Sequence, residues 1–302
     1  MNSVLVTGAG GFLGRFLLPF LAGRGFTVHA AVRPGSEKPG GAHFCHEADL
    51  LSPGAAGRLA ESVRPSHLVH LAWCSEPSTY LSCPDNRAWV SASRELAAAF
   101  AEAGGRRAVF VGSCYEYATG SAPRSEAETP LSPETLYGAC KKELFLSLLQ
   151  SFSGTGTSFC WARPFFLFGP GEKPGRLVSL VAKRILSGRE TPPVLGGLVR
   201  DYLYIENAAA ALALLVQSEI AGPVNLASGA GVTLRSLVLG LCAHLGGEDL
   251  VQWAADKEGR HAPRIVADVA RLRDEAGFAP RFSLEEGLAA TARWYLQPSR
   301  NR

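Results

Sequence analysis

The chain has 302 residues, of which 47% are hydrophobic and 19% are charged, so it can bury a sizeable core and is not expected to be disordered. Its net charge of +3 comes from 30 basic and 27 acidic residues that form no basic stripe, which argues against a nucleic-acid partner. No basic leader and no apolar run of about 20 residues is seen, so we expect a cytoplasmic protein without a membrane partner.

Strands and helices are predicted to alternate in the first half of the chain. Ser3–Thr7 is an apolar, β-branched run that ends at a glycine and predicts a buried strand. Leucines at positions 13, 17 and 21 then predict a helix, although Pro19 removes one backbone donor and is expected to kink it. Further strands are expected at residues 26–32, 67–71, 108–112 and 157–162, and further helices at residues 92–103 and 134–150. This alternation predicts an α/β fold with a Rossmann-type doubly wound parallel sheet.

The composition changes near residue 165, because residues 164–175 are rich in proline and glycine. We therefore expect a dinucleotide-binding domain at residues 1–165, with a return to the sheet at residues 201–227. Residues 166–200 and 228–302 are expected to form a smaller C-terminal substrate lobe.

The seven cysteines are odd in number and contain no CxxC pair. Disulfide frameworks and zinc sites need an even set or closer spacing. We therefore expect reduced, mostly buried thiols, and neither the cysteines nor the histidines suggest a metal site.

A glycine-rich turn follows the first strand and opens the first helix. Glycines allow a tight turn and close approach of the backbone to a pyrophosphate, and the helix N-terminus offers free N–H groups. The residues expected to bind this part of a dinucleotide are Gly8, Gly11, Phe12, Leu13 and Gly14.

The end of the second strand predicts which nicotinamide cofactor is used. An NAD site usually has an acid here for the ribose 2′-hydroxyl, whereas this chain has Arg33, with Ser36 nearby. A guanidinium pairs with a phosphate through two hydrogen bonds. NADP(H) is therefore favoured as the cofactor, and NAD(H) stays open.

Tyr137 and Lys141 are four residues apart on a predicted helix and so share one face. A lysine cation there is expected to lower the pKa of the tyrosine, whose phenol can then exchange a proton with a carbonyl or alcohol oxygen. Ser113 follows the strand at residues 108–112, at the edge where a parallel sheet binds ligands. We expect Ser113, Tyr137 and Lys141 to be the catalytic residues.

These motifs, together with several short motifs later in the chain, resemble the extended short-chain dehydrogenase/reductase family. The resemblance is in particular to its NAD(P)-dependent epimerase/dehydratase type, which modifies nucleotide sugars. The resemblance follows the family's order over nearly the whole chain. It rests on residues 8–14, 111–117, 136–141, 163–171, 200–205, 224–229, 283–288 and 294–295.

The resemblance implies roles for individual residues. Tyr137 would be the acid/base, Lys141 its activator and a contact to the ribose, and Ser113 a donor to the substrate oxygen. Further cofactor contacts would come from Asp49, Leu50, Leu71, Ala72 and Pro164, together with Tyr137 and Lys141 themselves. Arg200 would pair with the diphosphate of a nucleotide-sugar substrate, with Arg176 and Arg260 as weaker candidates. Family members often form homodimers through the helices expected at residues 92–103 and 134–150, so a homodimer is expected.

The neighbours of Ser113 bear on the reaction. Sugar 4,6-dehydratases of this family typically carry an Asp-Glu pair directly after the serine or threonine, whereas this chain has Cys114 and Tyr115. Glu116 comes one position later, which in an extended segment would turn it to the other face. A decarboxylase would also need the missing glutamate. Trp89 replaces an asparagine that is frequent in the family, so a proton relay through that position is not expected.

A 4-ketoreductase or a 4-epimerase therefore remains. We favour NADPH-dependent reduction of an NDP-4-keto-6-deoxy sugar at C4, in which Tyr137 protonates the oxygen. Three alternatives stay open: an NAD-dependent nucleotide-sugar 4-epimerase, a reductase of a non-sugar carbonyl, and a redox-silent protein that senses NADP(H).

Overall fold

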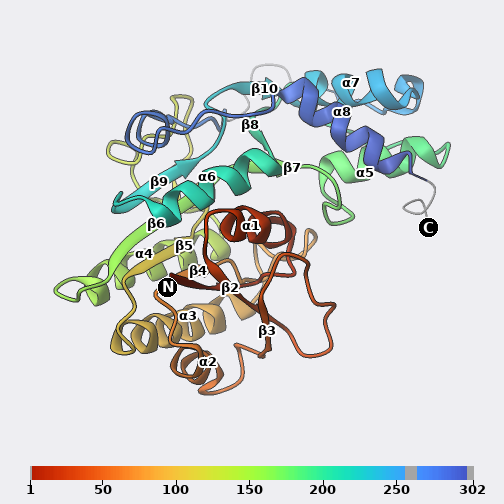
Figure 1. Ribbon diagram of the computed structural model, residues 1–302. Helices are drawn as coiled ribbons and strands as arrows, with labels where there is room; N and C mark the ends of the chain where they lie inside the picture. Colours follow the sequence, from red (N-terminus) through yellow and green to blue (C-terminus); the bar gives the residue numbers. More distant parts are fainter. Residues whose placement is uncertain (1, 256–263, 298–302) are drawn as a thin grey trace.

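A computed structural model describes residues 2–255 and 264–297 of the chain (Figure 1). Seven parallel strands form the main sheet, in the order β3-β2-β1-β4-β5-β6-β9. Their bounds are β1 Ser3–Thr7, β2 Thr27–Val32, β3 Phe44–Glu47, β4 His67–His70, β5 Arg107–Val111, β6 Ser158–Pro164 and β9 Gly222–Leu226. Because the chain runs outward on both sides of the β1–β4 pair, the sheet is doubly wound, which confirms the predicted fold class.

Helices cover both faces of this sheet (Figure 1). One face carries α1 and α6, and the other carries α2, α3 and α4. Their bounds are α1 Phe12–Gly23, α2 Ala55–Val63, α3 Asp85–Glu102, α4 Leu136–Phe152 and α6 Ile205–Gln217. The layers follow from strand geometry, in which successive side chains point to opposite faces. Along β1, Val4 and Val6 pack in the cluster under α1 and α6, whereas Leu5 packs on the opposite side.

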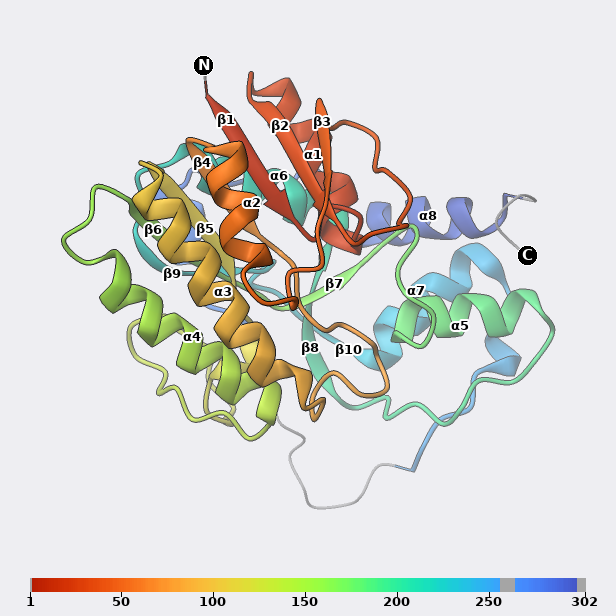
Figure 2. The same cartoon turned by 90° about the horizontal axis from the view of Figure 1, so that it is seen from below.

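A second, smaller assembly stands at one end of the sheet (Figure 2). It contains a three-stranded sheet in the order β10-β8-β7, and three helices whose apolar faces share one core cluster. The strands are β7 Phe166–Phe168, β8 Val199–Tyr204 and β10 Gly231–Thr233, and the helices are α5 Leu177–Leu186, α7 Leu234–Leu245 and α8 Leu284–Tyr295. The exact division into a dinucleotide domain and a substrate lobe stays a prediction.

Some local details differ from the sequence pattern. Helix α1 continues through Pro19, whose ring packs beside Gly41. Helix α3 begins at Asp85, seven residues earlier than the alanine-rich stretch suggested. The cysteines are free thiols, and Cys114, Cys140, Cys160 and Cys242 are buried. Within residues 2–255 and 264–297, no helix has the length and apolarity to cross a membrane.

Candidate active site

The glycine-rich turn lies against the end of β4, where the strand order of the main sheet reverses. Gly8 has a φ of +68°, and a Cβ there would stand 2.7 Å from the amide nitrogen of Ala72. A Cβ on Gly14 would stand 2.6 Å from the carbonyl oxygens of Gly8 and Ala9. Both glycines are therefore required by backbone contacts, whatever binds at the turn.

The N-terminus of α1 is open to an anion. Gly11 is the N-cap residue and, in the described part of the chain, no side chain caps this helix and no acid occupies its first turn. The N–H groups of the first turn, at Phe12 and Leu13, therefore keep the positive end of the helix dipole available. This cradle fits the pyrophosphate of a dinucleotide.

A buried hydrogen-bond chain fixes the two strands that carry this cradle. Thr7 Oγ1 lies 2.8 Å from His70 Nδ1, and His70 Nε2 lies 2.8 Å from Ser93 Oγ. The amide of Ala72 also donates to Thr7 Oγ1, at 3.4 Å. Burial, with the nearby charge of Lys141, lowers the pKa of His70 to about 3, so this ring stays neutral. The role of His70 could not be predicted from the sequence, because a lone histidine in a strand carries no motif.

Gly8→Ala is expected to destabilise the fold by about 1–3 kcal/mol and to weaken dinucleotide binding, since the methyl group must displace backbone atoms of residues 71–72. Urea unfolding and cofactor titration measure the two effects. Gly25→Ala is the matched control: Gly25 also has a positive φ, +82°, but has no neighbour within 4 Å of the added carbon. Equal losses of stability and of cofactor affinity in the two variants would show that the contact with Ala72 contributes nothing to the effect of Gly8→Ala.

Arg33 and Ser36 occupy an exposed turn after β2. The turn closes through the Ser36 amide, which donates to the Arg33 carbonyl oxygen at 3.0 Å. It lies beside the glycine-rich turn, because a Cβ on Gly10 would come within 4.0 Å of the Glu37 carbonyl oxygen. Glu47, which no sequence motif indicated, also reaches this turn, and its carboxylate accepts from the Gly35 amide at 3.4 Å. The turn therefore combines an arginine with a carboxylate contributed by β3.

The other predicted cofactor contacts lie along the same edge. Asp49 follows β3, and its carboxylate accepts from the Leu51 amide at 3.2 Å, while Leu50 is buried. The Leu71 amide donates to the Thr7 carbonyl oxygen at 3.1 Å, and Pro164 ends β6. These positions are consistent with the predicted contacts, which themselves stay predictions.

Ser113 begins a single 3-10 turn, Cys114–Glu116, directly after β5. The Ser113 amide donates to Glu116 Oε1 at 2.7 Å, and Ser113 Oγ accepts from the Tyr115 amide at 3.2 Å. The segment is therefore a tight turn and not the extended stretch assumed above. Glu116 is fully buried and forms an ion pair of 2.7 Å with Arg163, so it points into the core beneath Ser113.

Tyr137 lies in the first turn of α4, whose N-cap residue Thr135 accepts from the Gly138 amide. Aromatic rings surround it, with centroid distances of 5.2 Å to Tyr80 and 6.4 Å to both Tyr115 and Trp73. Burial raises the pKa of Tyr137 above its ordinary value, and a hydrogen bond with Ser113 opposes this only in part. Ser113 and Tyr137 thus lie close together, and their catalytic roles stay predictions.

The expectation that Lys141 lowers the pKa of Tyr137 is not met in this structure. Lys141 Nζ donates to the Val111 carbonyl oxygen at 2.7 Å and lies 3.6 Å from the centroid of the Trp73 ring, but 5.9 Å from that of the Tyr137 ring. Burial lowers the pKa of Lys141 itself to about 7. The ammonium is therefore turned toward the indole and only partly charged at neutral pH.

Two of the three predicted substrate arginines approach this cluster through aromatic rings. The Arg176 guanidinium lies 4.6 Å from the centroid of Tyr80, and Nη1 donates to the Tyr80 hydroxyl at 3.4 Å. The Arg200 guanidinium lies 5.7 Å from the centroid of Phe166. Arg260 lies outside the described residues. The ring beside Arg176 contacts Tyr137 directly, whereas Phe166 reaches Tyr137 only through Tyr115.

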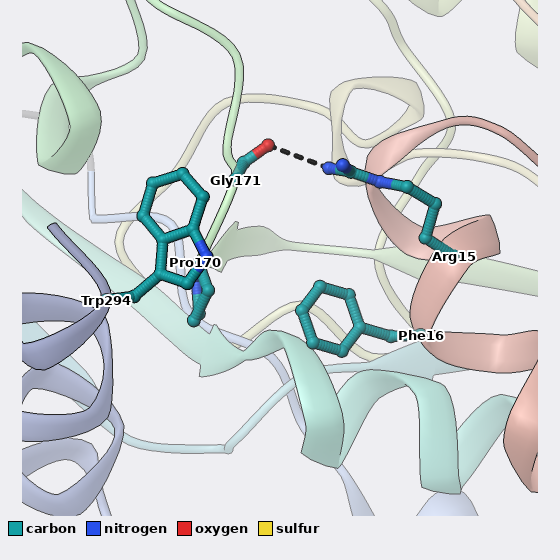
Figure 3. Close-up of a pocket in the computed structure, with 5 residues that line it drawn as sticks. All are labelled: Arg15, Phe16, Pro170, Gly171 and Trp294. Carbon is teal, nitrogen blue, oxygen red and sulfur yellow. Dashed lines mark hydrogen bonds between the residues drawn. The ribbon is translucent and has the colours of Figure 1, made fainter. Parts of the chain in front are cut away.

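A pocket of about 380 Å³ lies apart from this cluster (Figure 3). It lies between α1, the loop after β7 and α8, and Arg15 Nη2 donates across it to the Gly171 carbonyl oxygen at 2.9 Å. The pocket is lined by Arg15, Phe16, Pro170, Gly171 and Trp294. None of these is a predicted catalytic residue. This pocket is therefore not where the chemistry is expected.

The model of a known protein family, described as the NAD dependent epimerase/dehydratase family, matches residues 4–227. Among curated proteins, the dTDP-glucose 4,6-dehydratase of Streptomyces griseus is 31% identical over 172 residues, which are 56% of this chain and 52% of that protein. The dehydratase of Streptomyces antibioticus is 31% identical over 169 residues, 55% and 50% of the two chains. The chain thus spans about half the length of the curated relatives it matches.

Solved structures match over almost the full chain. The UDP-glucose 4-epimerase of Thermus thermophilus, in complex with NAD, has a TM-score of 0.86 at 26% identity and covers 98% of this chain and 99% of its own. The UDP-glucose 4-epimerase of Thermotoga maritima, with UDP-glucose, has a TM-score of 0.86 at 23% identity and covers 97% and 98%. The second likeness is evidence for the fold alone.

Proposed function

The chain belongs to the NAD-dependent epimerase/dehydratase family, of the extended short-chain dehydrogenase/reductase type, and from this premise we propose that it reduces an NDP-4-keto-6-deoxy sugar at C4 with NADPH. The substrate would be a nucleotide sugar whose diphosphate pairs with Arg200 and Arg176. Arg260 is a further candidate for this contact. Guanidinium groups suit this role because they bind phosphate oxygens in pairs.

The observation that carries the choice of NADPH is the arginine at the end of β2. Arg33 stands where an NAD site usually places an acid, on a turn beside Gly10. Ser36 lies on the same turn and offers a hydroxyl to a 2′-phosphate. Glu47 opposes this assignment, since its carboxylate lies at the Gly35 amide and would repel a phosphate.

The state of Tyr137 supports reduction. Because burial raises its pKa, Tyr137 is a phenol at neutral pH, which is the form that protonates an oxygen as a carbonyl is reduced. Bound NADPH would supply the hydride to C4. Ser113 would orient the same oxygen, and Lys141 would lie beside the ribose.

The positions after Ser113 argue against a dehydratase. An elimination needs an acid and a base at the sugar C5 and C6, and the family's Asp-Glu pair is replaced by Cys114 and Tyr115. Burial raises the pKa of the Cys114 thiol to about 12, so it does not act as a base at neutral pH. Glu116 is held in an ion pair with Arg163 beneath the site and is not available as a base.

A second candidate is an NAD-dependent nucleotide-sugar 4-epimerase. It is favoured by the likeness to the Thermus thermophilus epimerase, which binds NAD and matches along both whole chains. Mass spectrometry of the nucleotide released from the denatured, as-purified protein separates the two. Stoichiometric NAD would support the epimerase, whereas an empty site or loosely held NADP(H) would support the reductase.

Two further alternatives make different demands. A reductase of a non-sugar carbonyl would leave Arg176 and Arg200 without a diphosphate to bind, and a redox-silent NADP(H) sensor would not need the Ser113–Tyr137 pair. Turnover assays with a panel of NDP-4-keto sugars and aromatic ketones distinguish these cases. We also propose a homodimer formed through α3 and α4. It is supported by Leu146 and Leu149 on α4, which are 49% and 40% exposed.

Arg33→Ala is expected to weaken NADPH binding by about 10–150-fold and to leave NADH binding unchanged, since a charge-assisted hydrogen bond to the 2′-phosphate contributes about 1.5–3 kcal/mol. Fluorescence titration with both cofactors measures this. Arg189→Ala, at an exposed position in the C-terminal lobe, is the control. Equal affinity of the Arg33 variant and the parent protein for NADPH would disprove the assignment.

A further inference from the structure

The loop that leaves β4 places an indole directly over the predicted catalytic lysine. The centroid of the Trp73 ring lies 3.6 Å from Lys141 Nζ, and the same ring meets Tyr137 edge to face at 6.4 Å. Trp73 thus touches both members of the acid/base pair. It was not singled out by any sequence motif.

The orientation of this indole is fixed by its surroundings. Trp73 Nε1 donates to Asn86 Oδ1 at 2.6 Å, and Asn86 Nδ2 donates to the carbonyl oxygens of Tyr80 and Cys83 at 2.8 Å each. Asn86 is fully buried, so these bonds are shielded from water. Trp89 stacks against Trp73, with ring centroids 6.1 Å apart and an interplanar angle of 26°. The ring is therefore a rigid wall of the site.

The buried ammonium of Lys141 needs a partner for its charge. Only 3% of the residue is exposed, and its ammonium has three donors, one of which reaches the Val111 carbonyl oxygen. An aromatic face attracts a cation through its quadrupole, most strongly where water is excluded. We propose that Trp73 is a positioning residue, whose indole face holds the Lys141 ammonium at the Val111 carbonyl oxygen, 5.9 Å from the centroid of the Tyr137 ring, and stabilises its charged form.

This inference rests on the proposed function only for the role of Lys141 and Tyr137, because the contact itself is independent of substrate and cofactor. The same inference assigns a structural role to Trp89. The tryptophan that replaces the family's asparagine stacks on Trp73 and so supports the wall that holds the lysine.

Three titratable groups near Lys141, namely His70, Tyr137 and Cys140, have pKa values shifted away from neutral pH. Burial lowers the pKa of His70 to about 3 and raises the pKa values of Tyr137 and Cys140. Glu116, whose charge favours the ammonium, is held in its ion pair with Arg163. A titration observed near pH 7 at this place therefore reports on Lys141.

The test is an NMR titration of the whole protein labelled with [ε-¹³C]lysine. The chain has six lysines, and Lys141→Met identifies the signal of interest. In the parent protein, Lys141 is expected to titrate near pH 7. In Trp73→Leu the pKa is expected to fall by about one unit, a tenfold change in the acid dissociation constant, because the cation loses its aromatic partner. Trp73→Phe should give an intermediate value.

Trp253→Leu is the matched control, because Trp253 lies 4.2 Å from the Arg235 guanidinium in the C-terminal lobe and does not touch Lys141. An unchanged or raised pKa of Lys141 in Trp73→Leu would overturn the proposal. If that variant does not fold, the Trp73→Phe titration decides in the same way. No cofactor or substrate is added, so a result of either sign stands even if 4-keto reduction is not observed.

Discussion

Replacing Tyr137 with phenylalanine is expected to lower kcat by about 10²–10⁴-fold, the contribution typical of a general acid, and to leave cofactor affinity unchanged. The substitution removes only the hydroxyl. The ring contacts with Tyr80, Tyr115 and Trp73 remain, so the loop after β4 and the turn after β5 should keep their positions. The measurements are NADPH consumption with an NDP-4-keto sugar and fluorescence titration of the cofactor.

Tyr295→Phe provides the control for the loss of a buried hydroxyl. Tyr295 is 1% exposed and packs in the core of the C-terminal lobe, away from Ser113 and Lys141. Its variant should retain full turnover. Turnover by Tyr137→Phe at the parental rate would remove this residue from the acid/base role, and loss of cofactor affinity together with turnover would point to a structural role for the hydroxyl.

The parts of the site that depend on local backbone chemistry were predictable from the sequence. Gly8 and Gly14 follow a β-branched strand at a spacing that only a tight turn into a helix explains, and the structure shows backbone atoms where a side chain would be. Tyr137 and Lys141 share a helix face because they are four residues apart. Ser113 follows a strand, so its place at the edge of a parallel sheet follows from topology.

The parts that depend on long-range packing were not predictable. Glu116 and Arg163 are 47 residues apart, and only the pairing of β5 with β6 brings them together. Trp73 and Tyr80 lie in a loop without periodicity, so nothing in the pattern indicates that they border Tyr137. The pKa of Tyr137 was misjudged for the same reason, since burial among rings sets it and not the spacing to Lys141.

Glu116→Gln is expected to lower the free energy of unfolding by about 3–5 kcal/mol, because it leaves the buried Arg163 guanidinium without its counter-charge. Arg163 is 1% exposed and Glu116 is fully buried, so water cannot replace the lost partner. The same carboxylate accepts from Trp161 Nε1 at 3.0 Å and from the Ser113 amide at 2.7 Å. Urea unfolding measures the loss.

The control is Glu143→Gln, which breaks the exposed 3.0 Å pair with Arg94 and should cost less than about 1 kcal/mol. A Glu116→Gln variant as stable as this control would show that the buried pair has no net role. The double variant Glu116→Gln, Arg163→Met should recover most of the stability, because it removes the unpaired cation instead of leaving it in the core. Its turnover should nevertheless stay low, since the neutral Gln amide oxygen accepts more weakly than a carboxylate from the Ser113 amide and so holds the catalytic serine less firmly in its turn. Recovery of stability without recovery of turnover would separate the two tasks of this one carboxylate.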